Sequence, residues 1–310
     1  MQINYDTNKI IHNFTYMEKK IVIAGGTGFI GKYLENYFNT QGYTIKIISR
    51  QPHTLQWSDT KAIVDALENA EMLINLAGKS VDCRYNKKNK AEILSSRVDT
   101  TNILGDCVLQ CKVAPKLWLN SSTATIYRHA EDRPMTESTG EIGTGFSVGI
   151  ARQWEKAFFN FTLPKTRQVA LRMAIVLGDD GGVMHPLKNL VRVGLGGKQG
   201  SGNQRFSWIH IEDLKDIILY IQAHTEMSGV YNCAAPEPVT NEIFMKLLRS
   251  KMHIPFGLPS PKWLLKIGAV LINTETELIL KSRWVLPERL LDKGFVFTYP
   301  CLETALNNIL

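Results

Sequence analysis

No apolar run in this chain approaches the ~20 residues that a membrane-spanning helix needs. The N-terminal residues also lack the apolar stretch and the small-residue cleavage site of a signal peptide. Five cysteines are odd in number and include no Cys-x-x-Cys pair, and we interpret Cys107 and Cys111 as buried free thiols on a helix. These absences predict a protein of the reducing cytoplasm with no membrane span and no metal site.

The chain also lacks a strong excess of charge of one sign. Lysine and arginine number 36 against 29 acidic residues, a formal net charge of +7, and the cations are scattered without a nucleic-acid-binding motif. The densest basic run, at 84–90, is typical of a solvated helix face. We therefore expect no nucleic-acid partner, whereas an anionic small-molecule cofactor or substrate suits the mild positive bias.

What the chain does contain is an alternation of short apolar runs and helical patterns. Such alternation predicts an α/β fold with a doubly wound, parallel, Rossmann-type sheet. Strands are predicted at 21–24, 44–48, 72–75, 116–119 and 169–172, and helices at 59–70 and 91–111.

The pattern changes after residue 180, where a helix is predicted at 183–193, a glycine-rich loop at 194–202 and largely helical segments from 240 onward. The loop lacks the Lys-Ser/Thr ending of a P-loop, so it is either a substrate-side loop or a plain connection. We divide the chain into an N-terminal extension at 1–18, with Met17 as a plausible initiator, a core domain at 19–180 and a smaller C-terminal substrate lobe at 181–310. Some segments of this lobe are expected to return to the sheet.

The most informative segment is IVIAGGTGFIG at 21–31, a short strand followed by three glycines and a helical pattern. Gly25 permits a sharp turn, Gly28 leaves room for a pyrophosphate, and Gly31 lets the helix pack closely on the sheet. A structural turn between strand and helix is the alternative, but the context favours dinucleotide binding. Further contacts are expected from Thr27, Phe29 and Ile30.

The second predicted strand ends IKIISRQP, without the carboxylate that usually holds the ribose 2′-hydroxyl of NAD. Ser49 and Arg50 stand there instead. An arginine can hold the 2′-phosphate of NADP through charge-assisted, forked hydrogen bonds, so the cofactor is predicted to be NADP(H). A surface arginine without a ligand is the alternative. Small residues after the third strand allow close approach of the same cofactor, which adds Leu76, Ala77 and Gly78 to the predicted site.

The G-x-x-G-x-x-G spacing in GGTGFIG resembles the extended short-chain dehydrogenase/reductase superfamily, which includes sugar-nucleotide epimerases and dehydratases. Residues 75–78 resemble its N-x-A-G element on the adenine and ribose side. Residues 119–127, LNSSTATIY, resemble the strand and loop that carry its catalytic serine or threonine. Thr123 matches that residue and can hydrogen-bond a substrate oxygen. Ser121 and Ser122 are alternatives, and all three can instead satisfy backbone groups.

The acid/base pair of that superfamily, Tyr-x-x-x-Lys followed four residues later by glutamate, is incomplete here. In FSVGIARQWEKAFFN, Glu155 matches the glutamate, but Ser147 and Ala151 occupy the tyrosine and lysine positions. No tyrosine lies between Tyr127 and Tyr220, so no shift of register restores the pair.

This departure resembles a narrower group of atypical members, epimerase-like proteins with a distinctive C-terminal domain of uncharacterised function. The resemblance covers about residues 20–310 and is carried by INLAGKSVDCR, SSRVDTT, LRMAIVLGDDGGVM, FSWIHIEDL, NCAAPEPVTNEIF and GFVFTYPCLETAL. It implies an NADP(H)-binding, epimerase-like oxidoreductase acting on an unidentified small substrate, sugar-nucleotide-like or otherwise anionic. The epimerase label rests on superfamily analogy. A non-catalytic NADP(H) sensor or regulatory protein is the alternative, which the missing pair favours.

Other side chains are candidates to replace the lost pair. Arg97 stands where ordinary members carry an asparagine on the central helix, so its guanidinium is a candidate to contact the cofactor or an anionic substrate. Tyr127 is the phenol nearest the nicotinamide side by position, with packing as its alternative role. Arg172 and Arg205 are candidates to bind a substrate phosphate or carboxylate, and we expect His210 to organise a turn.

Overall fold

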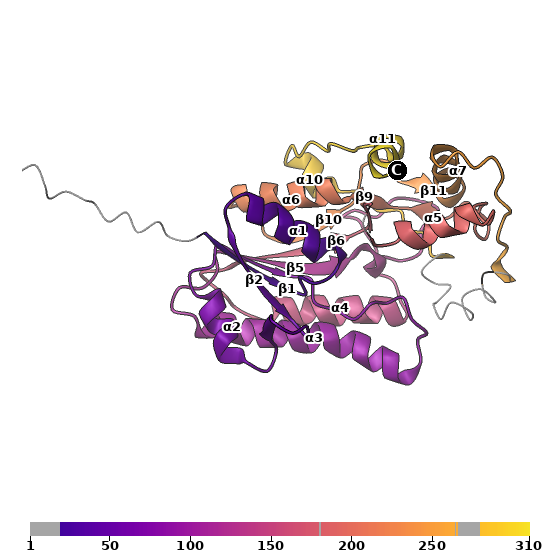
Figure 1. Ribbon diagram of the computed structural model, residues 1–310. Helices are drawn as coiled ribbons and strands as arrows, with labels where there is room; N and C mark the ends of the chain where they lie inside the picture. Colours follow the sequence, from indigo (N-terminus) through magenta and orange to yellow (C-terminus); the bar gives the residue numbers. More distant parts are fainter. Residues whose placement is uncertain (1–18, 180, 264, 266–279) are drawn as a thin grey trace, which may run out of the picture.

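A seven-stranded parallel sheet forms the centre of the molecule (Figure 1). The computed structural model describes residues 19–179, 181–263, 265 and 280–310, so the expectations for the extension at 1–18 and for Met17 lie outside the described residues. The strand order is β10-β6-β5-β4-β1-β2-β3. The strands are β1 (Lys20–Ala24), β2 (Thr44–Ser49), β3 (Leu55–Gln56), β4 (Met72–Asn75), β5 (Leu117–Thr123), β6 (Arg167–Met173) and β10 (Gly229–Cys233).

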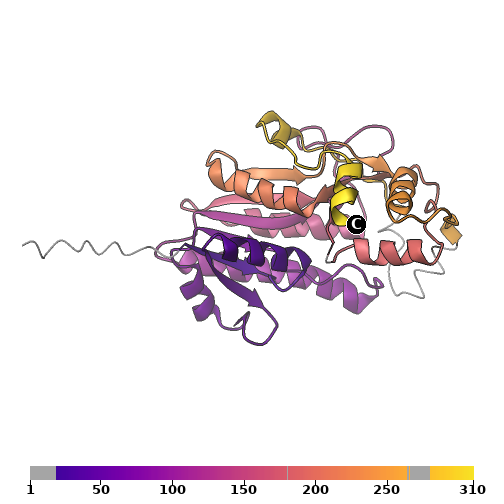
Figure 2. The same cartoon turned by 45° about the horizontal axis from the view of Figure 1, so that its top comes forward.

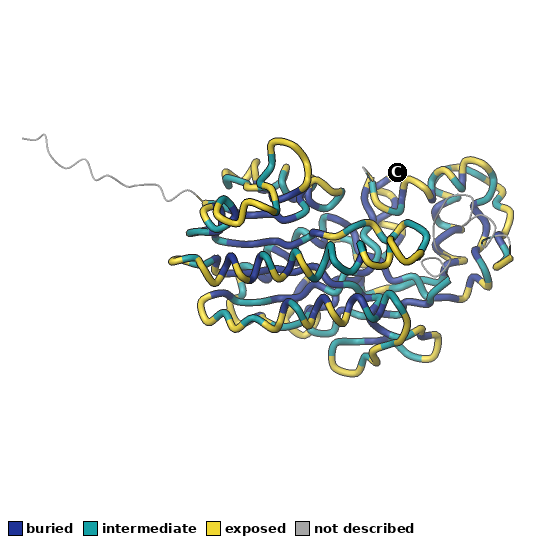
Figure 3. The backbone as a smooth tube through the Cα atoms, turned by 90° about the horizontal axis from the view of Figure 1, so that it is seen from below, coloured by how far each residue is buried: buried dark blue, intermediate teal, exposed yellow. Residues whose placement is uncertain are grey.

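Helices cover both faces of this sheet, as the doubly wound expectation requires. α1 (Phe29–Thr40) and α6 (Ile211–Ala223) lie on one face, and α2 (Thr60–Leu67), α3 (Lys87–Gln110) and α4 (Phe146–Phe159) on the other. Alternate residues of β1 feed the two cores, because successive side chains of a strand point to opposite faces. Ile21 and Ile23 pack with α1 and α6, whereas Val22 packs with α2 and α3. Figure 3 shows the buried strands and the exposed outer turns of the helices.

A second lobe adjoins the carboxyl ends of the strands. Its helices α5 (Met184–Arg192), α7 (Asn241–Lys251) and α11 (Leu302–Ile309) share one apolar core and lie together, although they are far apart in sequence (Figure 2). Two small sheets complete it. β7 (Ile175–Leu177) pairs in parallel with β9 (Trp208–His210), and β8 (Arg205–Phe206) pairs antiparallel with β11 (Val239–Thr240).

The small sheet of β7 and β9 joins the two sides of the predicted division at residue 180. β7 lies before that residue and β9 after it, and their side chains contribute to the cores of both lobes. Later segments return to the core domain, as expected. β10 adds a strand to the sheet, and α6 packs on one of its faces. α10 (Glu288–Asp292) contributes Leu290 to the core shared with α1. β3 and β10 are strands that the sequence patterns did not predict.

One stretch of the C-terminal region, residues 281–286, links the two lobes, and we call it the connecting segment. Met135 N donates to Trp284 O at 2.7 Å and Leu286 N to Met135 O at 3.0 Å. On its other edge, Ser207 N donates to Arg283 O at 3.1 Å and Arg283 N to Arg205 O at 2.8 Å. These backbone bonds fix the side chains of the connecting segment near the carboxyl ends of the strands.

The composition predicts no membrane-spanning helix and free cysteine thiols. None of the helices in the described part of the chain has the length and apolar character needed to cross a membrane. All five cysteines are free thiols, with Cys107 buried and Cys111 half-buried.

Candidate functional site

The turn between β1 and α1 lies in a cleft at the carboxyl ends of the strands. Gly25 has φ +76°, and a Cβ there would lie 2.7 Å from Ala77 N. A Cβ on Gly31 would lie 2.4 Å from the carbonyl oxygen of Gly26. Both positions therefore require glycine for the fold itself.

Gly28 differs from these two glycines. Its φ is −82°, which any residue adopts, and the nearest protein atom to an added Cβ is Gly25 O at an ordinary 3.7 Å. Gly28 is the N-cap residue of α1, where it offers no side chain to the first turn, and it borders the cleft. A Cβ here would not clash with the protein, but it would occupy space in the cleft. The absence of a side chain at Gly28 therefore leaves the backbone beside the N-terminus of α1 accessible to a phosphate.

Beside β2 the cleft widens into a cavity of about 480 Å³. Ser49 is buried and shapes the wall, because its hydroxyl contacts Thr54 Oγ1 at 2.9 Å and accepts from Gln51 N at 2.9 Å. Arg50 is exposed and borders the cavity. Glu92 borders it too, but forms its salt bridge with Lys79 and interacts with Arg50 only at longer range. The lining also includes Thr27, Trp57, Leu76, Ala77, Gly78 and Lys79.

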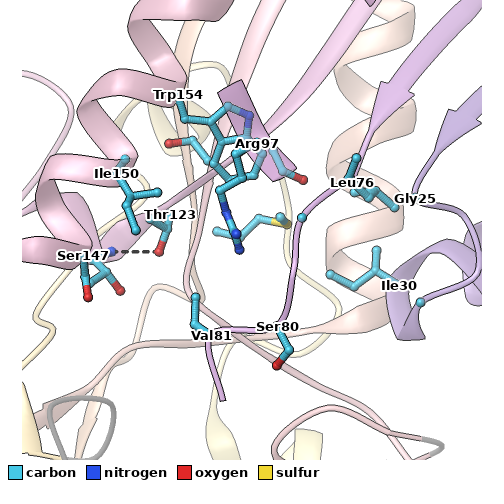
Figure 4. A pocket seen from close by; sticks show the side chains of 18 of the residues that line it. Gly25, Ile30, Leu76, Ser80, Val81, Arg97, Thr123, Ser147, Ile150 and Trp154 are labelled. Carbon is cyan, nitrogen blue, oxygen red and sulfur yellow. Dashed lines mark hydrogen bonds between the residues drawn. The ribbon is translucent and has the colours of Figure 1, made fainter. Parts of the chain in front are cut away.

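A second cavity, of about 470 Å³, continues from the first toward α4 and shares Gly25, Gly28 and residues 76–78 with it. Figure 4 shows Arg97 extending into this space, with Thr123 and Ser147 on one side and Leu76 and Ile30 on the other. The two cavities together border every predicted cofactor residue as well as Thr123 and Arg97, but not Tyr127, Arg172 or Arg205. The lining that the patterns did not predict includes Ser80, Val81, Tyr85, Thr125, Ile150, Trp154 and Met173.

Arg97 is a half-buried cation whose partners are neutral. Its Nη1 donates to Lys79 O and Ile93 O, both at 3.0 Å, and its Cζ lies 5.2 Å from the centre of the Trp154 ring. Burial lowers the pKa of Arg97 to about 10, which leaves the guanidinium charged at neutral pH. No carboxylate in the described ranges forms an ion pair with it, so an anion entering the cavity meets an uncompensated charge.

The position of Arg97 relative to α4 is informative. Trp154, on which its guanidinium lies, is three residues after Ala151, and residues at this spacing share a helix face. Ala151, Trp154 and Arg97 all line the second cavity. The cation from α3 therefore lies against the face of α4 where the resemblance places the missing lysine.

Hydroxyl groups gather at the end of β5. Thr123 Oγ1 accepts a bond from Thr125 N at 3.1 Å and caps the short helix η1 (Ala124–Ile126), yet Thr123 also borders the cavity. Ser121 borders the same cavity, but its Oγ is buried and has no hydrogen-bond partner among the described residues. Ser122 instead donates to Glu155 Oε1 at 2.6 Å.

The structure does not bring Tyr127 to the cavity, which corrects the expectation based on its position in sequence. Tyr127 is only 1% exposed, and its hydroxyl donates to Asn232 Oδ1 and accepts from Arg172 Nη1, both at 2.9 Å. Burial raises the pKa of Tyr127. Arg172 pairs with Glu155 at 2.7 Å, and although burial opposes its charge, the hydrogen bonds and charge of Glu155 raise its pKa. Tyr127 and Arg172 thus stabilise the fold.

Two other candidates have different positions. His210 caps α6, with Nδ1 accepting from Glu212 N at 3.2 Å, which is the turn-organising role expected of it. Arg205 lies outside the cofactor-sized cleft, where it borders a third cavity. No group of three or more metal-ligating side chains is placed to hold a metal among the described residues.

Comparisons with known proteins agree with this geometry. Residues 21–234 match the NAD dependent epimerase/dehydratase family, and residues 260–309 match a domain of unknown function, DUF1731. The chain belongs to the NAD dependent epimerase/dehydratase family. This confirms the expected superfamily and the distinctive C-terminal domain.

The alignments with relatives extend over almost the whole chain. The epimerase family protein YfhF of Bacillus subtilis (strain 168) is 32% identical over 302 residues, covering 94% of this chain and 97% of the relative. The human epimerase family protein SDR39U1 is 31% identical over 297 residues, covering 94% and 99%. A crystal structure of human SDR39U1 (isoform2) with NADPH has a TM-score of 0.85 at 30% identity, covering 94% of this chain and 98% of that chain.

Proposed function

We propose that this protein binds NADP(H) in the cleft that extends from Arg50 to Thr123 and acts as an oxidoreductase, epimerase-like in fold, on a small anionic substrate. The observation that carries the proposal is the continuity of the two cavities across the bare backbone at Gly28. The solved relative that contains NADPH supports the choice of cofactor.

The residues present suit each part of the cofactor. The N-terminus of α1 and the surface at Gly28 would hold the pyrophosphate. Arg50 would hold the 2′-phosphate, and residues 76–78 would lie along the adenine and ribose. The nicotinamide end would then reach the part of the second cavity bordered by Thr123, Ser147 and Ala151.

NADP(H) exchanges a hydride with a substrate carbon, so a proton must move to or from the attached oxygen. Thr123 and Ser147, which both carry hydroxyls, border the cavity. Hydroxyls of this kind hold the substrate oxygen and relay a proton between it and water. Arg97 provides positive charge that stabilises developing negative charge on that oxygen.

Binding is tested by titrating the purified protein with NADPH and NADH and following cofactor fluorescence. We expect NADPH to bind at least about tenfold more tightly than NADH, because only NADPH carries the phosphate for Arg50. Equal affinities, or no binding of either, would contradict the proposed cofactor.

A non-catalytic NADP(H) sensor is the second candidate, and Ser147 and Ala151 in place of the acid/base pair favour it. The two functions separate on hydride transfer. A sensor binds NADPH and never passes its hydride to a metabolite, whereas the oxidoreductase does. The proposal also places the protein in the reducing cytoplasm, supported by its free thiols, and cell fractionation tests that location.

A further inference from the structure

A third cavity, of about 420 Å³, adjoins the nicotinamide end of the cleft. Ser80 and Val81 border both spaces. The connecting segment is joined to the cleft as well, because Lys281 Nζ donates to Thr125 O at 2.6 Å and Arg283 Nε to Thr125 Oγ1 at 3.1 Å. The third cavity is therefore a neighbour of the second one, separated from it by Ser80 and Val81.

Positive charge predominates in the lining of the third cavity. Arg205, Lys281 and Arg283 border it, and Asp82 is the single carboxylate among its described lining residues. Arg205 lies flat on the Trp284 ring, with Cζ 4.3 Å from the ring centre. No carboxylate in the described part of the chain pairs with Arg205, so its donors remain available to an anion.

The three amide residues of the lining, Gln199, Gln204 and Asn241, are hydrogen-bonded to one another. Gln199 N donates to Asn241 Oδ1 at 2.8 Å, and Asn241 Nδ2 donates to Gln199 Oε1 at 3.0 Å. Gln204 Nε2 donates to Gln199 O at 2.7 Å. A sugar needs several free donors and acceptors for its hydroxyls, and these amides do not offer them without breaking buried hydrogen bonds.

The remaining wall is apolar. Val183 precedes α5, and with Leu187 and Leu190 it falls at the i, i+4, i+7 spacing that lines one helix face. Ile175 and Phe206 add aliphatic and aromatic surface. A mostly apolar cavity with a few convergent charged groups is typical of small-molecule sites that bind an apolar body and orient it through one polar end.

We propose that the third cavity binds an organic anion with an apolar body. Its carboxylate or phosphate lies on Arg205, Lys281 and Arg283, and its body packs against Val183, Leu187 and Leu190. The inference rests on the proposed function only in making this anion the substrate, since binding itself needs no hydride transfer. It favours an amphipathic acid or phosphate ester over a sugar nucleotide.

The test measures binding of four probes to the full chain saturated with NADPH, by calorimetry. 4-Phenylbutyrate and phenyl phosphate carry an apolar body and an anion, 4-phenylbutanol lacks the charge, and UDP-glucose carries charge with a polar body. We expect one or both aryl anions to bind at least about tenfold more tightly than the alcohol and UDP-glucose. The better aryl anion distinguishes carboxylate from phosphate.

Variants then locate the site. Arg205→Gln and Lys281→Met should each weaken the better aryl anion about tenfold and leave NADPH affinity within about twofold. Arg192→Gln removes an exposed arginine of α5 outside the lining and is the matched control. NADPH binding reports whether each variant is folded, and Lys281→Met decides the matter if Arg205→Gln does not fold.

Equal binding of the alcohol, tighter binding of UDP-glucose, or no binding of any probe would overturn the inference. So would aryl-anion affinity that both folded variants leave unchanged. If NADPH binds normally in those cases, the proposed cofactor site stands and only the assignment of the third cavity fails. Failure of NADPH to bind the wild-type chain is the separate result that contradicts the proposed function.

Discussion

The two ends of the cofactor cleft differ in what carries their chemistry. At the β2 end, backbone geometry and one cation form the site, with Gly28 bare and Arg50 exposed beside it. At the α4 end, Ser147 and Ala151 stand at the positions of the usual proton-transfer pair, and a guanidinium from α3 lies against the same helix face. The comparison teaches that cofactor binding and proton transfer are separate requirements, which the proposed function assigns to different residues of one fold.

The largest expected effect comes from filling the β2 end with a side chain. Gly28→Val should lower NADPH affinity at least about a hundredfold, or about 2.7 kcal/mol, because its side chain occupies the phosphate position. The melting temperature should change by less than about 3 °C, since the added Cβ meets no protein atom closer than 3.7 Å. Fluorescence titration and calorimetry measure the two quantities.

Gly25→Val is the matched comparison for that variant. Its left-handed φ of +76° and the 2.7 Å approach to Ala77 N predict a destabilised fold. Equal loss of stability in the two variants would show that Gly28 serves the fold and not a ligand.

Removing the exposed cation should have the next largest effect. Arg50→Ala should weaken NADPH about tenfold and leave NADH unchanged, because only the 2′-phosphate interacts with the guanidinium. Lys46→Ala removes an exposed cation within β2, four residues before Arg50, and should change neither affinity. If Arg50→Ala weakens both cofactors equally, Arg50 does not distinguish them.

The α4 end can be tested by moving its positive charge. Ala151→Lys alone should destabilise the protein, because it places a second cation in the buried space that Arg97 already occupies. Combining it with Arg97→Asn should recover about 1–2 kcal/mol relative to the sum of the single variants. Urea unfolding of the four proteins measures this coupling. Additive effects would mean that Arg97 does not occupy the region of the missing lysine.

The smallest expected effect comes from comparing two hydroxyl-bearing residues, Tyr127, which is buried, and Thr123, which borders the cavity. Tyr127→Phe should cost about 1 kcal/mol of unfolding free energy, since it removes bonds to Asn232 and Arg172, and should leave NADPH affinity unchanged. Thr123→Ala should have a smaller effect on stability and slow hydride transfer instead. Denaturant unfolding measures the stability of both variants, and NADPH titration measures their cofactor affinity. Loss of NADPH binding in Tyr127→Phe would show that Tyr127 contributes to the cofactor site.

The residues that border the β2 end of the cleft were predictable because their signal is local. A strand, a glycine turn and a helix follow one another within 21–31, so spacing alone predicts the geometry. The same holds for β1, β2, β4, β5 and β6, each of which contains an apolar run. β3 has only two residues, and β10 reads GVYNC, which has neither a continuous apolar run nor a strict alternation.

The other end of the site depends on distant segments. Tyr127 is held by Asn232, 105 residues away, and by Arg172, 45 residues away. Lys281 and Arg283 reach Thr125 across 156 and 158 residues. No sequence pattern encodes such contacts, because they arise when the lobes pack and the connecting segment bonds to both.

Hydride transfer tests the central claim most directly. The protein is incubated with NADPH deuterated at C4, each face in turn, together with a cell metabolite extract, and products are analysed by mass spectrometry. The account predicts a metabolite that gains one deuterium with the wild-type chain, less of it with Thr123→Ala and none with Gly28→Val. A wild-type chain that binds NADPH tightly yet labels no metabolite would contradict the oxidoreductase function and leave the sensor.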